Sequence, residues 1–485
     1  MKLQKQHIVL LLFAALVLGF AGAYAGVKLA QPGPDNGQDS AANQTDEQNQ
    51  ENVEPPAKIQ KVARAYNLIK DNYLEDVKDK QLIEGAIQGM LASLEDPYSS
   101  YLDAEMMKNF NDTIESSFEG IGAEVSMVDG KVTIVSPIKD SPAEEAGLRP
   151  NDQILSVDGE SVAGLNLQET VQEIRGKKGT EVVIKIQRDG VSEPFDVTLV
   201  RDDIPVETVY SEVKTIDGKK TGLMEITSFA ENTAEHFSKQ LKELEDKGIE
   251  GLVIDVRGNP GGLLTAVEKI LKNFIPDDIP YVQIEDQNGQ VSKSYSNLGE
   301  KKPYPISVLI NEGSASASEI LAVAMKETGY DVVGTKSFGK GTVQQALPLG
   351  DGSRVKLTFF KWLSPEGTWI HEKGVKPTIK EEQPSYYFTN PVQLVEPLSY
   401  NDTGDNVKNI QIMLKGLGYD PGRTDGYFNQ DTEEAVKSFQ KEHELKATGK
   451  VNDKTAGKIE TEIVEHIRSG EDDQQMEKAL NELYQ

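Results

Sequence analysis

The chain of 485 residues contains no cysteine. This absence excludes disulfide bonds, thiolate metal sites and a cysteine nucleophile. Basic residues are also in short supply, since 51 lysines and arginines stand against 79 aspartates and glutamates and leave a net charge of −28. Such an acidic balance argues against nucleic acid as a partner, and against anionic lipid held by bulk charge. Solubility outside the cytoplasm is a sufficient reason for it.

One long apolar run lies near the N-terminus, from Ile8 to Val27, behind a short basic segment. This order predicts an export signal that places the rest of the chain outside the membrane. Ala23-Tyr24-Ala25 has the form of a cleavage site, yet the run is about long enough to span a bilayer. Residues 1–28 are therefore interpreted as a signal peptide or, with some preference, an uncleaved membrane anchor.

A small-residue segment lies within residues 306–345, around which the chain is organised. The run Ser307–Ile310 predicts a strand that ends at an Asn-Glu-Gly turn, and apolar spacing from Ser318 predicts a helix that stops at Gly329. The segment Ser314–Ser318 therefore lies between a strand end and a helix N-terminus. Free backbone N–H groups and the helix dipole favour developing negative charge there, which suits a nucleophile.

A second segment, Ser337–Gln344, places Lys340 between two glycines in a tight loop. A lysine can act as the general base for a serine if burial lowers its pKa enough to make it neutral. The alternative is a solvated lysine in a hairpin loop, just as a Ser/Ala run is commonly a loop that enters a helix. Each segment alone leaves these alternatives open.

Taken together, Ser-Ala-Ser-Ala-Ser-Glu-Ile at 314–320 and Phe-Gly-Lys-Gly-Thr-Val-Gln at 338–344 closely resemble the carboxy-terminal processing (tail-specific) serine protease family. The resemblance implies that Ser316 is the nucleophile, that Lys340 is its base and that Gln344 orients the lysine. It also implies an acyl-enzyme mechanism that needs no metal or nucleotide, so no cofactor is expected.

The predicted strand Gly251–Arg257 leads into a turn, Gly258–Gly262, whose glycines permit positive φ. Peptide hydrolysis needs donors for the tetrahedral oxyanion, and losing one costs on the order of 3 kcal/mol. In the resembled family, one N–H of this final glycine pair and the N–H after the nucleophile supply them. The resemblance thus implies Gly262 and Ala317, with Gly261 as the fallback; a turn without catalytic duty is the alternative.

Residues 116–203 resemble a PDZ domain. Phe118–Val125 is similar to the loop and strand that capture a peptide C-terminus, where successive N–H groups converge on a carboxylate and the peptide adds to the sheet edge. Arg175, near the end of a predicted helix, would couple peptide capture to the protease, as an arginine here does in related enzymes; a solvated surface arginine is the alternative. The resemblance implies peptide binding at Gly120, Ile121, Gly122 and Ala123.

Helices are predicted both before the PDZ-like segment and after the protease-like segment. Apolar residues three or four apart in residues 58–115 indicate short amphipathic helices that either cover the core or form an interface. Related proteases dimerise through this region, which implies a homodimer. Residues 397–460 resemble a small helical peptidoglycan-binding domain, through motifs such as Leu417-Gly418-Tyr419 and Asp425–Phe428. A folded module that no longer binds glycan is the alternative.

The expected fold is multidomain α+β: an α/β protease core of crotonase/ClpP-like type with an inserted PDZ β-barrel domain, N-terminal helices and a small C-terminal α-helical domain. The predicted parts are a signal or anchor (1–28), a disordered linker (29–57), a helical region (58–115), a PDZ domain (116–203), a protease core (204–380), a linker (381–396), a peptidoglycan-binding-like domain (397–460) and a charged helical tail without assigned function (461–485).

These features predict an exported serine endopeptidase of the Gram-positive cell envelope, membrane-anchored or secreted, that recognises exposed C-terminal segments of proteins. The resemblance to related exported proteases implies a role in envelope maintenance or sporulation signalling, and the residues do not choose between the two. Protein or peptide substrates, peptidoglycan, the cytoplasmic membrane and a second copy of the chain are the expected partners, and nucleic acid is not.

Three alternatives stay open on the sequence alone. The chain could be a non-catalytic, cell-wall-bound PDZ scaffold, or a crotonase-like acyl-transfer enzyme with a similar core and oxyanion site. A Ser-His-Asp triad is also open, because triads are defined by geometry rather than chain order. No nucleophile-elbow motif accompanies the candidate histidines, which are His236, His371 in a predicted strand region, His443 and His466.

Overall fold

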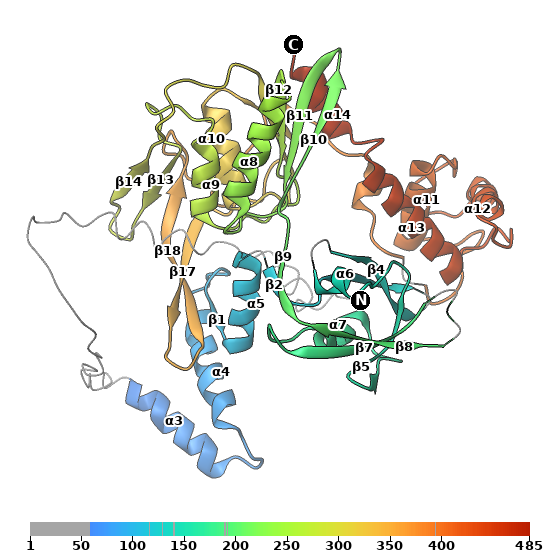
Figure 1. The fold of residues 1–485 in the computed structure, drawn as a ribbon, viewed down its shortest axis with the longest axis horizontal. Coiled ribbons are helices and arrows are strands. Elements are labelled where there is room, and N and C mark those ends of the chain that lie inside the picture. The colour runs from blue at the N-terminus through green and yellow to red at the C-terminus, as the bar shows by residue number, and fades with distance from the viewer. Residues whose placement is uncertain are drawn as a thin grey trace, which may run out of the picture.

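The computed structural model describes residues 59–485, apart from residues 116, 129, 139, 140, 189, 190, 192 and 393. The predicted signal or anchor (1–28) and linker (29–57) lie outside the described residues. Within the described part of the chain, no helix combines the length and apolar character needed to cross a membrane. Figure 1 shows N-terminal helices, a small β domain, an α/β core and C-terminal helices, which confirms the expected multidomain fold class.

The core is built on a six-stranded sheet in the order β10-β11-β12-β15-β16-β19, in which β10 runs antiparallel to β11 and the other pairs are parallel. The central strands β12 and β15 are apolar and buried almost throughout, as parallel strands covered on both faces should be. The strand bounds are β10 Val209–Ile216, β11 Lys219–Ile226, β12 Gly251–Asp255, β15 Ile306–Ile310, β16 Asp331–Gly334 and β19 Ile379–Lys380.

Successive residues of these strands face opposite sides of the sheet. One side, which includes Ile254 and Val308, packs on three helices: α8 (Thr233–Asp246), α9 (Leu264–Leu271) and α10 (Ala317–Glu327). The other side, which includes Val253 and Leu309, is covered by the last helix, α14 (Gln474–Glu482). The charged tail, to which the sequence assigned no function, thus completes the core.

A second sheet joins the N-terminal region to the core, in the order β1-β18-β13-β14 with β17 beside β18. Strands β17 (Thr342–Pro348) and β18 (Arg354–Leu363) form a long hairpin, and β1 (Ser100–Leu102) pairs with β18. The other two strands are β13 (Val282–Glu285) and β14 (Val291–Ser294). Segments far apart in the sequence, β1, β13 and β17, therefore all pair with β18.

The small β domain holds a sheet in the order β3-β4-β5-β7-β8, with β6 beside β5. The chain enters it through β2 (Ser117–Gly120) and leaves through β9 (Asp202–Pro205), and these two strands pair with each other. They form the connection to the rest of the molecule (Figure 1). The bounds within the domain are β3 Ala123–Val128, β4 Lys131–Pro137, α6 Pro142–Glu145, β5 Gln153–Val157, β6 Glu160–Ser161, α7 Leu167–Ile174, β7 Glu181–Gln187 and β8 Phe195–Val200.

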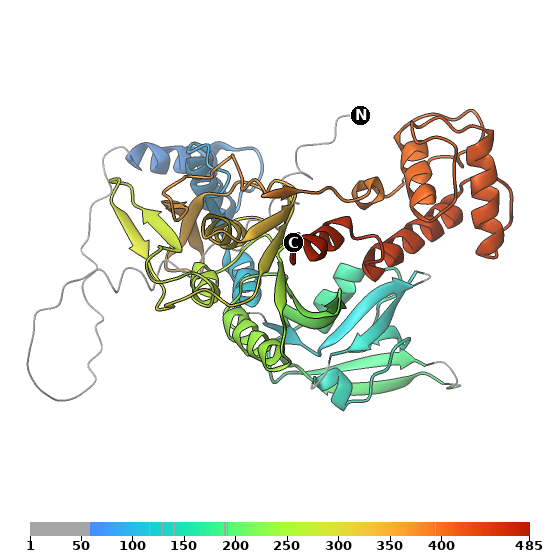
Figure 2. The same ribbon diagram turned by 90° about the horizontal axis from the view of Figure 1, so that it is seen from above.

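Helices form both ends of the described chain. The C-terminal ones pack around a core of their own that includes Phe428 and Phe439. Figure 2 shows them projecting to one side while the chain end returns to the core. The predicted boundary between residues 460 and 461 falls inside α13. The bounds are α3 Ile59–Asn72, α4 Asp79–Ala92, α5 Ala104–Glu115, the 3₁₀ helix η1 Ser385–Phe388, α11 Asp405–Gly416, α12 Gln430–Glu442 and α13 Asp453–Ser469.

Candidate active site

Ser316 lies where the chain turns from β15 into α10, as the sequence pattern predicts. It is the N-cap residue of α10 and has φ 55° and ψ −112°, a backbone conformation that is uncommon for a residue with a side chain. Its side chain is buried, and so is nearly every residue of α10. The core therefore holds Ser316 in a strained position at a helix N-terminus, where developing negative charge is favoured.

The carboxylate of Glu319 ties this turn to the loop that carries Lys340. Glu319 Oε2 accepts hydrogen bonds from the backbone N–H groups of Ser316 (2.9 Å) and Lys340 (2.8 Å). Its Oε1 accepts from Gly339 N (2.6 Å) and Ser337 Oγ (2.6 Å). The carboxylate is fully buried, and burial raises the pKa of Glu319 although the four donors oppose the rise. The sequence analysis did not identify Glu319 as a site residue, although the Ser-x-x-Glu spacing of a helix cap could have indicated this contact.

Lys340 is buried, with 2% of its surface exposed. Burial, assisted by the positive charge of Lys356, lowers the pKa of Lys340 from 10.5 to about 7. Its Nζ lies 5.3 Å from the centre of the Tyr98 ring. The lysine is therefore not the solvated hairpin residue of the alternative interpretation, and its environment is one in which the neutral amine is accessible near pH 7.

The N-terminal region completes this environment. Tyr98 lies in the segment between α4 and β1, and in the same segment Asp96 Oδ2 accepts a hydrogen bond from Thr358 Oγ1 of β18 (2.7 Å). Lys356, also on β18, is buried, which lowers its pKa to about 8. The sequence reasoning missed Asp96, Tyr98 and Lys356 as site residues, because Asp-Pro-Tyr signals only a helix break and nothing local relates it to β18.

Gln344 lies on β17 beside a register shift between Val343 and Gln344, the kind of bulge that redirects a side chain. Its Nε2 donates to Thr342 Oγ1 (2.8 Å) and Thr358 Oγ1 (3.3 Å), whereas its buried Oε1 has no hydrogen-bond partner in the described part of the chain. Among the described residues, no hydrogen bond joins Lys340 Nζ to Gln344 or to Ser316. The three predicted residues share one buried region, but their side chains are not hydrogen-bonded to one another.

The glycine turn approaches Ser316 closely. A Cβ added to Gly261 would lie 2.8 Å from Ser316 Cβ, and one added to Gly262 would lie 2.1 Å from Phe229 O, so neither position has room for a side chain. Gly261 N donates to Asn259 Oδ1 (2.8 Å). Within the described chain, the N–H groups of Gly262 and Ala317 have no acceptor. In the described chain, the N–H groups of the two predicted donors are therefore available for an oxyanion, whereas the N–H of Gly261 is already hydrogen-bonded.

Among the described residues, no histidine is hydrogen-bonded to Ser316. His371 lies in a loop after β18, not in the predicted strand, and stacks on Trp369 with ring centres 5.0 Å apart. Its Nδ1 accepts from Gly341 N (3.3 Å). In the described residues, the polar partners of the other candidates are all acidic or tyrosine side chains, namely Glu207 for His236, Tyr419 and Glu462 for His443, and Asp472 for His466.

The predicted peptide-binding residues lie where β2 passes into β3. Gly122 has φ 74°, and its carbonyl accepts from Ile138 N (2.8 Å) and Ser141 Oγ (2.9 Å). Strand β3 is at the edge of its sheet and lies against α7, an arrangement that can accept an added peptide strand. Arg175 caps α7, and its guanidinium lies 4.8 Å from the centre of the Phe118 ring on β2. It therefore touches β2, one of the two strands that connect the small β domain to the core.

Sequence profiles of four families match the chain. They are peptidase family S41 at residues 220–381, the activating protease CtpB N-terminal domain at residues 16–106, a PDZ domain at residues 133–188 and a peptidoglycan binding domain at residues 403–459.

Individual relatives agree with these profiles. The chain is 50% identical over 471 residues to the carboxy-terminal processing protease CtpB of Bacillus subtilis (strain 168), covering 97% of each chain. It is 44% identical to CtpA of the same strain, covering 88% of this chain and 90% of the relative. Among solved structures, the photosystem II D1 C-terminal processing protease is 26% identical and covers 68% of this chain and 94% of its own, with a TM-score of 0.41. The chain belongs to the carboxy-terminal processing proteases of peptidase family S41, and it is a serine-type protease with a PDZ domain.

Proposed function

We propose that Ser316 and Lys340 form the catalytic dyad of this protease, with Gln344 orienting the lysine. The carrying observation is that one buried carboxylate, Glu319, binds the backbone of both the serine turn and the lysine loop. The alternative of a wall-bound scaffold gives no reason for a buried lysine beside a strained serine. A crotonase-like acyl-transfer enzyme is disfavoured by the protease family of the chain.

In the proposed reaction, neutral Lys340 Nζ takes the proton of Ser316 Oγ as that oxygen attacks the scissile carbonyl carbon. The N–H groups of Gly262 and Ala317 stabilise the resulting oxyanion. When the C–N bond breaks, the Lys340 ammonium returns the proton to the leaving amine and an acyl-enzyme ester remains. Water then attacks this ester, giving its proton to Lys340, and the acid product leaves as Ser316 Oγ is reprotonated.

We further propose that the described conformation is a resting state that peptide binding activates. Among the described residues, Gln344 Oε1 has no hydrogen-bond partner, which supports this, because it would be satisfied if Lys340 Nζ approached it. A peptide added to β3 would favour that state only if it binds it more tightly. Arg175, stacked on Phe118 of β2, is placed to transmit the change.

The coupling proposal has a separate test. Arg175→Ala should lower peptide-stimulated cleavage while Ser316 still reacts with a serine-directed probe. An equal loss of cleavage and of probe labelling would contradict a coupling role.

The physiological setting is also a proposal, which the sequence and its relatives support. We propose an exported enzyme of the Gram-positive envelope, held at the cytoplasmic membrane or secreted, which acts on proteins with exposed C-termini in envelope maintenance or sporulation signalling. The peptidoglycan binding profile at residues 403–459 supports wall contact. Homodimerisation is supported by α3, which has no buried residue and exposes Ile59, Val62, Leu68 and Ile69.

The catalytic proposal is tested by digesting an unfolded protein with an apolar C-terminus. The full-length protein should cleave it, with a PDZ-binding peptide added, while Ser316→Ala and Lys340→Ala should be inactive but folded by circular dichroism. Full activity of Lys340→Ala would refute the dyad. Absence of cleavage by the wild type under all conditions would favour the scaffold.

A further inference from the structure

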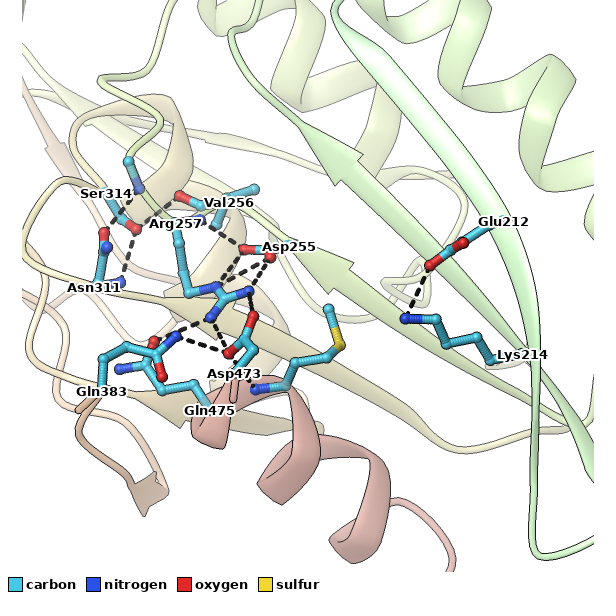
Figure 3. Close-up of polar contacts among 12 residues, drawn as sticks. Glu212, Lys214, Asp255, Val256, Arg257, Asn311, Ser314, Gln383, Asp473 and Gln475 are labelled. Carbon is cyan, nitrogen blue, oxygen red and sulfur yellow. Dashed lines mark hydrogen bonds and ion pairs between the residues drawn. The ribbon is translucent and has the colours of Figure 1, made fainter. Parts of the chain in front are cut away.

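The end of the chain is packed on the catalytic core. Figure 1 shows α14 lying beside the sheet of the core. Apolar residues of the C-terminal segment, Ala479, Leu480 and Leu483, cover the sheet face formed by Leu223, Val253, Leu309 and Val333. The N-cap of α14 is Asp473, whose side chain accepts a hydrogen bond from Met476 N (2.9 Å). This cap lies at the end of β12, where the oxyanion turn begins (Figure 3).

Asp473 also binds Arg257, the residue directly before the glycine turn (Figure 3). Arg257 Nη1 and Nη2 each donate to one oxygen of Asp473, both at 2.7 Å. On its other edge the guanidinium donates to Asp255, with Nη2–Oδ2 at 2.6 Å. All three side chains are at most 17% exposed. A forked pair of this kind, shielded from water, fixes position as well as charge.

Backbone contacts carry this restraint to the reacting groups. Gly258 N donates to Asn311 Oδ1 (2.8 Å), and Ser314 Oγ donates to Val256 O (2.7 Å). The Asn259 carbonyl accepts from Ala315 N (3.0 Å) and Ser318 Oγ (2.9 Å). The oxyanion turn and the serine turn are therefore joined by hydrogen bonds on both sides of Ser316. Arg257 lies in the segment 256–259 that makes these bonds.

We propose that Asp473, at the start of the C-terminal helix, is a positioning residue for the oxyanion site: through Arg257 it holds the turn 258–262 so that the Gly262 N–H points at the developing oxyanion. This rests on the proposed catalytic function. The neighbouring Asp472 accepts from Tyr386 Oη (3.1 Å) and His466 Nε2 (3.0 Å), so the same two-residue segment also contacts the helical C-terminal module.

Asp473→Ser tests the proposal in the full-length protein. Serine keeps an N-cap oxygen for α14 but cannot form the forked bond to Arg257. Asp473→Asn, which keeps one acceptor, should give an intermediate effect. Lys478→Ala, on the same helix and facing Glu482, is the matched control.

Affinities for a peptide boronic acid and for an uncleavable peptide amide distinguish a positioning role of Asp473 from a general effect on protein stability. Asp473→Ser should lower kcat by on the order of ten- to a hundredfold, since misplacement of about 1 Å carries such a cost. Affinity for a peptide boronic acid, whose tetrahedral adduct occupies the oxyanion site, should fall by a similar factor. KM, affinity for the matching uncleavable peptide amide and the properties of Lys478→Ala should stay near wild type.

Unchanged kcat and boronate affinity in folded Asp473→Ser would overturn the proposal. A loss of activity no larger than the unfolded fraction, measured by thermal denaturation, would also overturn it; if Asp473→Ser does not fold, Asp473→Asn decides by the same criteria. A wild-type protein without Ser316-dependent cleavage would instead refute the catalytic function on which the proposal rests.

Discussion

Replacing Glu319 by glutamine removes one charge and one acceptor from the centre of the site. The carboxylate now accepts four hydrogen bonds, two at each oxygen. A glutamine side chain has one acceptor oxygen, and its amide nitrogen must face one of the two donor pairs. The better orientation turns the nitrogen towards Ser337 and Gly339, because the Ser337 hydroxyl can rotate but two backbone N–H groups cannot.

The cost follows from the donor that is left unpaired. In that orientation the buried N–H of Gly339 has no acceptor, which costs about 1–3 kcal/mol. The three remaining hydrogen bonds become weaker because their acceptor is no longer charged. A neutral amide also costs less to bury than the carboxylate, whose burial raises the pKa of Glu319, so these two effects oppose each other. We therefore expect Glu319→Gln to lose about 1–3 kcal/mol of unfolding free energy and, since the Lys340 loop shifts, at least about tenfold in kcat.

Urea denaturation and peptide cleavage by the same preparations measure both effects. Glu327→Gln, on the same helix but with a single backbone donor from Glu366 N (2.8 Å), is the matched control and should lose less of both. A Glu319→Gln enzyme with wild-type stability and wild-type kcat would show that the carboxylate does not hold the two loops together.

Two further predictions concern Lys340 and the glycine turn. The pKa of Lys340 is about 7 when folded against an ordinary value of 10.5, so the unfolded chain binds more protons between these values and stability should rise with pH across that window. Lys340→Met should therefore stabilise the protein at pH 7 by on the order of several kcal/mol, and urea denaturation should show the gain disappearing near pH 10.5; a gain independent of pH would contradict the burial argument. Gly262→Ala should lower kcat by on the order of a hundredfold or more, because its Cβ would meet Phe229 O at 2.1 Å. Gly258→Ala, whose Cβ would meet no atom within 4 Å although its φ of 66° disfavours a side chain, should lose less activity, and equal losses in the two variants would argue against Gly262 as a donor.

The sequence predicted the parts of the site that are local in the chain. The strand, turn and helix around Ser316 follow from apolar periodicity, because the change of period marks the helix start. The glycine turn was equally predictable, since positive φ at Gly261 and Gly262 requires residues without a side chain.

What the sequence did not reveal depends on contacts between distant segments. Tyr98 reaches Lys340 only because β1 pairs with β18, and no local pattern specifies that pairing. The role of the last helix was missed for the same reason. Its few apolar residues do not predict a contact by themselves, and only the fold shows that they cover one face of the core sheet. In the described conformation, Gln344 Oε1 has no hydrogen-bond partner among the described residues. This depends on how the surrounding side chains pack, which the residue types alone do not determine.

The most direct test of the catalytic account is the pH dependence of Ser316 acylation by an activated ester, measured in the first turnover with a PDZ-binding peptide present. The account predicts a rate that rises with pH to a plateau with a midpoint near 7, the pKa that burial gives Lys340. Lys340→Ala should lose both the rate and the midpoint. A midpoint near the ordinary lysine value of 10.5, or an unchanged profile in Lys340→Ala, would contradict the assignment of this lysine as the base.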